Sequence, residues 1–314
     1  MPARPPIHCL MGPTGAGKTG FAVWLAARLP IEIVSVDSAL VYRGMDIGTA
    51  KPDPGTRRRA PHHLLDLCGP AEPYSVARFC ADAAAAVADI EARGRLPLLV
   101  GGTGLYFRRF ETGIADMPDV PEAVRHSLDE ALAREGAPAL HARLARVDPA
   151  SGERIHPNDP QRILRALGVF EASGQTMSQY LATPPPGGQR PFHKWVLAPP
   201  VRDPLRAGWV ARFNQMLDCG LVNEVSRLRA MPGVSLTCPA LRAVGYREVW
   251  QYLEGELDHA EMVQRSVTAT AQYAKRQYTW FRREQVNGWL DPGEPRTREI
   301  LIKALAEAAN RACD

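Results

Sequence analysis

Short apolar runs alternate with helical patterns over the first hundred residues of the chain. The runs at 7–11, 32–36 and 96–100 have the length of buried β-strands. Between them, residues 20–28 and 77–93 place apolar side chains at the three- and four-residue spacing of amphipathic helices. This alternation predicts an α/β fold in which a parallel sheet is flanked by helices.

The pattern becomes helical after residue 113. Asn158-Asp159-Pro160 is typical of a helix start, because a capping side chain precedes a proline at the first helical position, and a proline-rich run at 183–188 predicts a loop. We therefore expect 1–115 and 187–314 to form one core, and 116–186 to be a mostly helical insertion domain. In the last part the pattern predicts a strand at 195–198 and helices at 206–217, 222–231, 246–254 and 258–284.

The composition is that of a globular protein. Of the 314 residues, 45% are hydrophobic and 23% are charged, which excludes a disordered or fibrous chain. No apolar run reaches the ~20 residues that span a bilayer, and the N-terminal apolar stretch is too short for a signal peptide, so we expect a cytoplasmic protein without a membrane partner. The six cysteines lie far apart, which argues against a zinc site or a disulfide framework. A net charge of +4 permits a polyanionic partner without requiring one.

The most specific motif is GPTGAGKT at residues 12–19, which fits G-x-x-x-x-G-K-[ST] between a predicted strand and a predicted helix. Its glycines let backbone N–H groups converge on phosphate oxygens at a helix start, which predicts a P-loop NTPase-like sheet with a diphosphate site. Lys18 is expected to neutralise phosphate charge, and the Thr19 hydroxyl to ligate Mg²⁺. The predicted diphosphate-binding residues are Gly12, Pro13, Thr14, Gly15, Ala16, Gly17, Lys18 and Thr19.

Two further polar residues follow predicted strands. Asp37 comes directly after 32–36, and Thr103 follows the two glycines that end 96–100. Because open α/β sheets bind ligands at the carboxyl ends of their strands, both side chains are expected in the crevice of the P-loop. Asp37 could act there as a general base, cap a turn, or support a magnesium ion indirectly. The third strand ends in Gly-Gly-Thr rather than in the aspartate of a Walker B motif, which argues against an ordinary ATPase.

Eight sequence blocks occur in order along the chain: GPTGAGKT (12–19), VDSALVYRGMDIGTAKP (36–52), HHLLDL (62–67), YSVARF (74–79), GGTGLY (101–106), NDPQRILRAL (158–167), RAVGYREVWQYL (242–253) and QYAKRQYTWFR (272–282). Together they resemble the tRNA dimethylallyltransferases. The chain departs from the family pattern at Gly168, where glutamate is usual, and at Glu248, where glutamine is common. No zinc-finger pattern follows the last block, so the chain is similar to the bacterial members.

The resemblance implies transfer of a dimethylallyl group from dimethylallyl diphosphate to the exocyclic amine of the adenine 3′ of the tRNA anticodon. Diphosphate leaves, and the N–H groups of residues 14–19, Lys18 and Mg²⁺ held through Thr19 stabilise its charge. The resemblance assigns the general base to Asp37, and Arg212 matches a family arginine near the diphosphate; a solvated helix arginine is the alternative. The expected catalytic residues are Lys18, Thr19, Asp37 and Arg212, in a monomeric, magnesium-dependent enzyme.

The target adenine lies in a stacked loop and must be extruded to reach a carboxylate in a crevice. Basic residues mixed with aromatic ones in three segments predict a surface that follows RNA phosphates. Each segment could instead be a solvated face over a packed core, and Trp280 and Phe281 are expected to belong to the core. The resemblance also suggests a tRNA contact at Arg125. The predicted tRNA-binding residues are Asp37, Ser38, Ala39, Leu40, Thr103, Arg125, Gln161, Arg162, Ile163, Leu164, Arg165, Arg242, Ala243, Val244, Gly245, Tyr246, Arg247, Lys275, Arg276, Gln277, Tyr278, Thr279, Trp280, Phe281 and Arg282.

Two other functions are compatible with the P-loop. A kinase that phosphorylates a small molecule or nucleotide would share the P-loop and an acidic residue after the second strand, and a non-catalytic RNA-binding protein would share the basic segments. Residues 242–282 distinguish the kinase, which has no need of an aromatic and basic tail. His62 and His63 are adjacent and point apart in a strand, so a structural role is expected for both.

Overall fold

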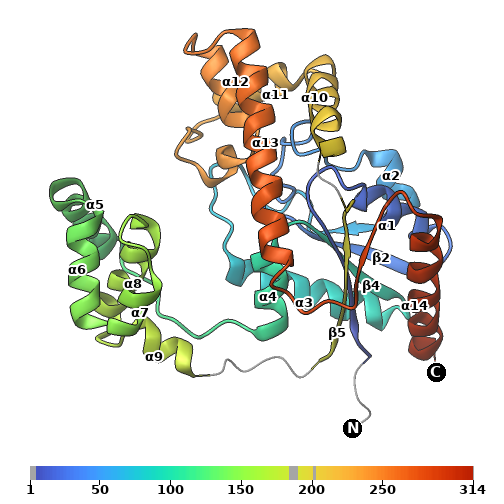
Figure 1. Ribbon diagram of the computed structural model, residues 1–314, viewed down its shortest axis with the longest axis horizontal. Coiled ribbons are helices and arrows are strands. Elements are labelled where there is room, and N and C mark those ends of the chain that lie inside the picture. Colours follow the sequence, from blue (N-terminus) through green and yellow to red (C-terminus); the bar gives the residue numbers. More distant parts are fainter. Residues whose placement is uncertain (1–4, 184–189, 201–202, 314) are drawn as a thin grey trace. The chain divides into compact units, whose positions relative to one another are not determined.

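Six strands in the described part of the chain form a fully parallel sheet in the order β3–β2–β4–β1–β5–β6. Figure 1 labels β2, β4 and β5 of this sheet. The structure is a computed structural model that describes residues 5–183, 190–200 and 203–313. The predicted parallel α/β sheet is confirmed, and the residues His62 and His63, described above as part of a strand, form its shortest strand. The strand of three residues at 288–290 was not predicted, because so short a run forms no recognisable pattern. The strands are β1 (Ile7–Met11), β2 (Ile31–Val36), β3 (His62–His63), β4 (Leu96–Gly101), β5 (Phe192–Leu197) and β6 (Gly288–Leu290).

Three neighbouring strands end at the same level of the sheet. Met11 in β1 and Val36 in β2 are both paired with Gly101 in β4. A Cβ atom at Gly101 would lie 2.0 Å from the carbonyl oxygen of Val36, so this position has no room for a side chain. The segments that follow β1, β2 and β4 therefore leave the sheet next to one another at its carboxyl edge.

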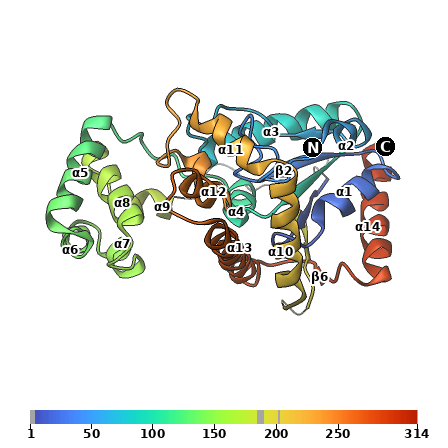
Figure 2. The same ribbon diagram turned by 90° about the horizontal axis from the view of Figure 1, so that it is seen from above.

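Side chains alternate along the buried strands, and each face of the sheet carries its own core. In β1, Cys9 and Met11 join a core with side chains of the helices α3 (Val76–Ala92), α4 (Gly104–Thr112), α11 (Leu221–Arg229), α12 (Tyr246–Leu253) and α13 (His259–Phe281). Leu10 faces the other way and packs in a core with Leu25 of α1 (Lys18–Ala26) and Leu305 of α14 (Pro295–Cys313). Figures 1 and 2 both show α1 and α14 next to each other. Since both faces are covered, β1, β2 and β4 are buried at every position.

The chain divides into two compact units, of which the first contains the sheet and consists of Met1–Glu111 and Gln189–Asp314. The Ser75 side chain caps its helix α3 by accepting the N–H of Arg78, and Asp258 caps α13 in a capping box. The helices are α1 (Lys18–Ala26), α2 (Pro54–Arg59), α3 (Val76–Ala92), α4 (Gly104–Thr112), α10 (Asp203–Asp218), α11 (Leu221–Arg229), the 3₁₀ helix η1 (Pro239–Arg242), α12 (Tyr246–Leu253), α13 (His259–Phe281) and α14 (Pro295–Cys313).

The second unit, Thr112–Gly188, consists of five helices in its described residues. Asp159 caps α8 by accepting the N–H of Arg162, with Pro160 in the first turn, which confirms the helix start read from the sequence. Leu140, Leu144 and Leu167 lie in its core with other apolar residues. The helices are α5 (Glu122–Glu135), α6 (Ala137–Val147), α7 (Pro149–Arg154), α8 (Pro160–Ser173) and α9 (Met177–Ala182).

Gly168 has a packing role within this second unit. A Cβ atom at Gly168 would lie 3.0 Å from Cγ1 of Val120 and 3.6 Å from Cδ1 of Leu128. The residue is buried in α8, where the usual glutamate of the family would meet these two apolar side chains. This close packing explains why glycine is accommodated where the chain departs from the family pattern.

Other features of the described residues narrow the kinds of site that the protein can contain. No described helix is both long enough and apolar enough to cross a membrane. Among the described residues, no group of three or more His, Cys, Asp or Glu could hold a metal ion.

His63 contacts Glu32 at 2.6 Å and His62 contacts the Ala60 carbonyl at 2.6 Å, which agrees with their structural role. Five cysteines whose side chains the structure describes are free: Cys9, Cys68, Cys80, Cys219 and Cys238.

Candidate active site

The P-loop is the turn between β1 and α1. Gly15 (φ +83°) and Gly17 (φ +79°) have left-handed backbone conformations, which glycine adopts without strain. Helix α1 begins at Lys18, directly after Gly17. The first N–H groups of a helix have no intrahelical partners and carry the positive end of its dipole. The turn therefore offers backbone donors to a phosphate group.

Thr14, in the same turn, is held by two helices from the C-terminal part of the chain. Its N–H donates to Oε1 of Gln277 in α13 (2.9 Å), and its carbonyl oxygen accepts a hydrogen bond from Nε1 of Trp209 in α10 (3.3 Å). Trp209 also covers Gly15, where a Cβ atom would lie 2.8 Å from Nε1. The expectation that all N–H groups of residues 14–19 face the diphosphate is therefore wrong for Thr14 and for Ala16, because the N–H of Ala16 donates to the carbonyl oxygen of Pro13 (3.3 Å).

Lys18 folds back over the loop. Its Nζ donates a hydrogen bond to the carbonyl oxygen of Pro13 (2.8 Å). Burial lowers the pKa of Lys18 to about 8, while the Asp37 carboxylate raises it and the Arg212 guanidinium lowers it. The ammonium group thus keeps its charge at neutral pH by a small margin, which a bound phosphate would enlarge.

Asp37 is the first residue after β2. Its Oδ1 accepts the N–H of Ala39 (2.8 Å), and the N–H of Ser38 donates to Oγ1 of Thr103 (3.3 Å). Burial raises the pKa of Asp37, and the Ala39 N–H and the positive charges of Lys18 and Arg212 offset only part of this effect. A carboxylate with a raised pKa is a better proton acceptor than an exposed aspartate. The turn-capping role and a role as a base are compatible, since only one oxygen is used by Ala39.

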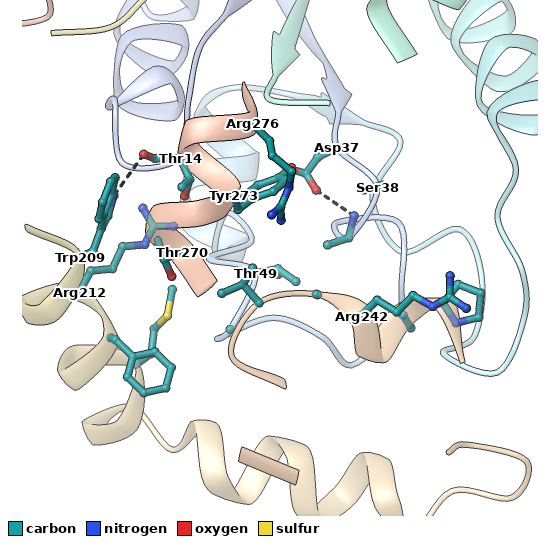
Figure 3. Close-up of a pocket in the computed structure, with 18 residues that line it drawn as sticks. Thr14, Asp37, Ser38, Thr49, Trp209, Arg212, Arg242, Thr270, Tyr273 and Arg276 are labelled. Atoms are coloured by element: carbon teal, nitrogen blue, oxygen red, sulfur yellow. Dashed lines mark hydrogen bonds between the residues drawn. The ribbon is translucent and has the colours of Figure 1, made fainter. Parts of the chain in front are cut away.

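Two cavities, each of about 330 Å³, are both lined by Asp37. One cavity is formed by the P-loop and the ends of the strands, and it contains Lys18 and Thr19. The other, drawn in Figure 3, is formed by α10, η1 and α13, and it contains Arg242 and Arg276. Leu40 lines the P-loop cavity, and Ser38 and Ala39 line the other. The residues that line both cavities are Thr14, Asp37, Thr49, Arg212 and Tyr273.

Tyr273 in α13 lies beside Asp37 and was not among the predicted site residues (Figure 3). Its hydroxyl interacts with the side chains of Thr103 and Gln277, and the Arg276 guanidinium lies 5.8 Å from its ring centroid. Burial raises the pKa of Tyr273, and the Asp37 charge raises it further, so the phenol remains protonated at neutral pH. The wall of the site at Asp37 is therefore an uncharged phenol covered by a cation.

The loop that carries Thr49 is held by a buried carboxylate that sequence reasoning missed. Glu224 in α11 accepts the N–H groups of residues 46, 47 and 48 at 3.0, 2.8 and 3.3 Å. It also accepts the hydroxyl of Tyr246 at 2.6 Å. The tRNA contact predicted for Tyr246 is wrong, because this side chain is fully buried. No local pattern marks Glu224, since its backbone partners lie 176–178 residues away.

The neighbouring segment 242–247 contributes to the cavity through residues other than Tyr246. Arg242, Ala243 and Val244 line the cavity of Figure 3, and Arg242 and Arg247 are exposed. Gly245 is buried at the start of α12, where its N–H donates to Oε2 of Glu248 (2.9 Å). Glu248, the other departure from the family pattern, thus caps the helix.

Helix α13 divides the predicted tRNA segment 275–282 between solvent and core. Lys275, Arg276, Thr279 and Arg282 are exposed. Trp280 packs against Gly104, where a Cβ atom would lie 2.2 Å from its ring, and the Arg108 guanidinium covers the ring at 4.9 Å. A side-chain contact with tRNA is therefore wrong for the buried residues of the segment, and the expectation that Phe281 belongs to the core is confirmed. The buried residues are Gln277, Tyr278 and Phe281.

The second unit, taken by itself, presents most of its predicted tRNA-binding residues to solvent. Arg125 in α5 is exposed, as are Gln161, Arg162 and Arg165 at the start of α8. The contact predicted for Ile163 is wrong, because its side chain is fully buried in the core of this unit. Leu164 is half-buried. Arg125 and Arg165 are therefore open to solvent, while Arg162 is paired with Asp159.

Comparison with known proteins gives consistent results over almost the whole chain. A family model described as IPP transferase matches residues 40–284. A tRNA dimethylallyltransferase of Alkalilimnicola ehrlichii is 52% identical over 299 residues, which are 94% of this chain and 93% of the relative. A tRNA dimethylallyltransferase of Burkholderia mallei is 53% identical over 281 residues, which are 88% of this chain and 86% of the relative.

Solved structures agree with these sequence relatives. The tRNA isopentenylpyrophosphate transferase of Bacillus halodurans has a TM-score of 0.69 and 33% identity, with 99% of this chain and 98% of that chain covered. A eukaryotic dimethylallyltransferase that acts on tRNA has a TM-score of 0.82 and 23% identity, with 97% of this chain and 80% of that chain covered, which shows a shared fold. The family model, the identities and the coverage together show that this chain belongs to the tRNA dimethylallyltransferase family.

Proposed function

We propose that this chain transfers a dimethylallyl group from dimethylallyl diphosphate to the exocyclic amine of the adenine immediately 3′ of the anticodon in tRNA, with release of diphosphate. The observation that supports this most directly is that Asp37 lines two cavities at once. One cavity contains backbone donors for a diphosphate, and the other contains Arg242 and Arg276. Asp37 therefore lies where the adenine amine, entering from one cavity, would meet the dimethylallyl group of the diphosphate bound in the other.

Asp37 is the proton acceptor in this proposal. The adenine N6 forms a bond to C1 of the dimethylallyl group, the C1–O bond breaks, and its electron pair leaves with the diphosphate. N6 is a weak nucleophile because its lone pair is delocalised into the ring, so loss of a proton to Asp37 as the bond forms lowers the barrier. A positioned base contributes about 10²–10⁴ in rate, or roughly 3–5 kcal/mol.

The leaving diphosphate requires stabilisation of its developing charge. The N–H groups that open α1, the ammonium of Lys18 and the guanidinium of Arg212 line the cavity for this purpose. The hydroxyl of Thr19 lines this cavity and fits a magnesium ion, because Mg²⁺ is bound through few protein oxygens together with phosphates and water. We propose that Thr19 holds Mg²⁺, which would supply additional positive charge to the diphosphate oxygens.

The other cavity is proposed to receive the extruded adenine of the anticodon loop. Single-stranded RNA is recognised by stacking and by contacts to its phosphates, and both types of group occur here. Tyr273 offers a ring, Arg242 and Arg276 offer charge, and Arg125 and Arg165 in the second unit offer further contacts to the stem-loop. We further propose that the enzyme acts as a monomer in the cytoplasm, a location that its tRNA substrate supports.

The direct test combines the protein, Mg²⁺, dimethylallyl diphosphate and unmodified tRNA, followed by mass spectrometry of the nucleosides. We expect adenosine to gain one five-carbon unit. A tRNA in which guanine replaces the adenine 3′ of the anticodon serves as the control and should gain none. If adenosine gains nothing while ATP hydrolysis depends on a small acceptor, the protein is a kinase and the proposal is wrong.

Replacing Asp37 with asparagine should separate catalysis from binding. Asp37→Asn keeps the shape of the side chain and one oxygen for the Ala39 N–H, but it removes the base. We expect the rate of transfer to fall by about 10²–10⁴, with tRNA affinity changed by less than about threefold. Single-turnover transfer and filter binding measure the two quantities. A large loss of affinity with retained turnover would contradict the assignment of the base.

The lowered pKa of Lys18 predicts the pH dependence of diphosphate binding. Lys18 loses its positive charge as the pH rises through about 8 in the free protein, so its contribution to binding is present below that pH and declines above it. Calorimetric titration with pyrophosphate between about pH 7 and about pH 9 should show that the ratio of the wild-type affinity to the Lys18→Met affinity falls as the pH rises. Because pyrophosphate itself titrates equally in both experiments, this effect cancels in the ratio. A constant ratio of affinities over this range would show that Lys18 does not titrate there.

Arg276 should contribute to tRNA binding through phosphate contacts. It is exposed and lines the cavity of Figure 3, so Arg276→Ala should weaken tRNA binding and reduce the slope of log K against log salt concentration by about 1. Arg265→Ala is the matched control, because Arg265 is an exposed arginine of α13 outside both cavities. Identical binding by Arg276→Ala and wild type at several salt concentrations would give Arg276 a structural role.

A further inference from the structure

Gln277 is a buried amide that uses both of its ends. Gln277 is only 6% exposed and lies where α13 passes the P-loop. Oε1 accepts the N–H of Thr14 (2.9 Å), and Nε2 donates to the carbonyl oxygen of Gly102 (2.9 Å). These partners lie 263 and 175 residues away in the sequence, in the segments that follow β1 and β4. One side chain thus joins three separate segments of the fold.

The space between these segments is filled by the amide. A Cβ atom at Gly102 would lie 2.2 Å from Nε2 of Gln277 and 3.3 Å from the carbonyl oxygen of Gly12. Trp209 holds the carbonyl of Thr14 at the same time. The backbone N–H and carbonyl groups of Thr14 are therefore both held in place, just before the residues whose N–H groups begin α1.

We propose that Gln277 is a positioning residue for the diphosphate site. By holding Thr14, it sets the direction in which the N–H groups of Gly15 and of residues 17–19 point, although it donates nothing to the diphosphate itself. The proposal rests on the proposed function only in that the diphosphate belongs to a prenyl donor; the site that it describes takes any diphosphate. Gln277 lies inside the segment predicted to bind tRNA, and the two roles make opposite predictions for its variants.

The test is a calorimetric titration of the full chain with inorganic pyrophosphate, accompanied by tRNA binding. Gln277→Met keeps the volume of the side chain and removes its hydrogen bonds to Thr14 and Gly102 together with its contact to the Tyr273 hydroxyl. We expect it to weaken pyrophosphate binding by about tenfold and to leave the tRNA dissociation constant within about twofold of wild type. Gln264→Ala is the matched control, because Gln264 is an exposed glutamine of the same helix outside both cavities, and it should change neither.

A second variant tests the same contact from its other side. Gly102→Ala places a methyl group where Nε2 of Gln277 lies, so it should displace the amide and weaken pyrophosphate binding as Gln277→Met does. If both act through one contact, the double variant should bind no more than about threefold more weakly than either single variant. The stoichiometry of tRNA binding gives the concentration of folded protein in each sample. A loss of pyrophosphate affinity can therefore be distinguished from partial unfolding of the variant.

Three outcomes decide the matter. Pyrophosphate bound as tightly by Gln277→Met as by wild type would overturn the positioning role, and so would a loss of tRNA binding equal to the loss of pyrophosphate binding. Independent, multiplicative effects of the two variants would also contradict it. Failure of the proposed function has a different signature: Gln277→Met binds pyrophosphate about tenfold more weakly than wild type, while neither protein transfers a prenyl group to tRNA.

Discussion

The register of β1, β2 and β4 is the constraint on which the site depends. Because Met11 and Val36 are both paired with Gly101, the three strands end level with one another. In a parallel sheet all carboxyl ends face the same edge, so the P-loop, Asp37 and Thr103 emerge within reach of each other. A shift of one residue in either ladder would move a phosphate cradle or a carboxylate by about 3.3 Å and turn its side chain to the other face.

The C-terminal helices supply the remaining side chains of the site at the edge of the sheet. Helix α10 supplies Trp209 and Arg212, and α13 supplies Tyr273 and Gln277, all of which reach the P-loop or Asp37. The buried Glu224 organises the loop of Thr49 from a third helix, α11. Each of these residues is placed by packing against the core that the sheet creates, so the catalytic geometry depends on the folding of the whole first unit.

Sequence reasoning located the P-loop and Asp37 because local patterns define them: a glycine-rich turn with a helix behind it, and an acidic residue directly after an apolar strand. It could not locate Glu224 or Gln277 as positioning residues, because their roles arise from contacts between segments more than 170 residues apart. The mixture of basic and aromatic residues in α13 predicted an RNA surface. Only one side of that helix is exposed, and the other side packs into the core.

The central claim is that Asp37 stands between a diphosphate and an extruded adenine. A crystal structure of the full chain with an unmodified tRNA and pyrophosphate measures this directly. The account predicts the diphosphate on the N–H groups that open α1, and the adenine N6 within about 2.6–3.2 Å of the free carboxylate oxygen of Asp37. An adenine that remains stacked in its loop, or a carboxylate turned away from both ligands, would contradict the account.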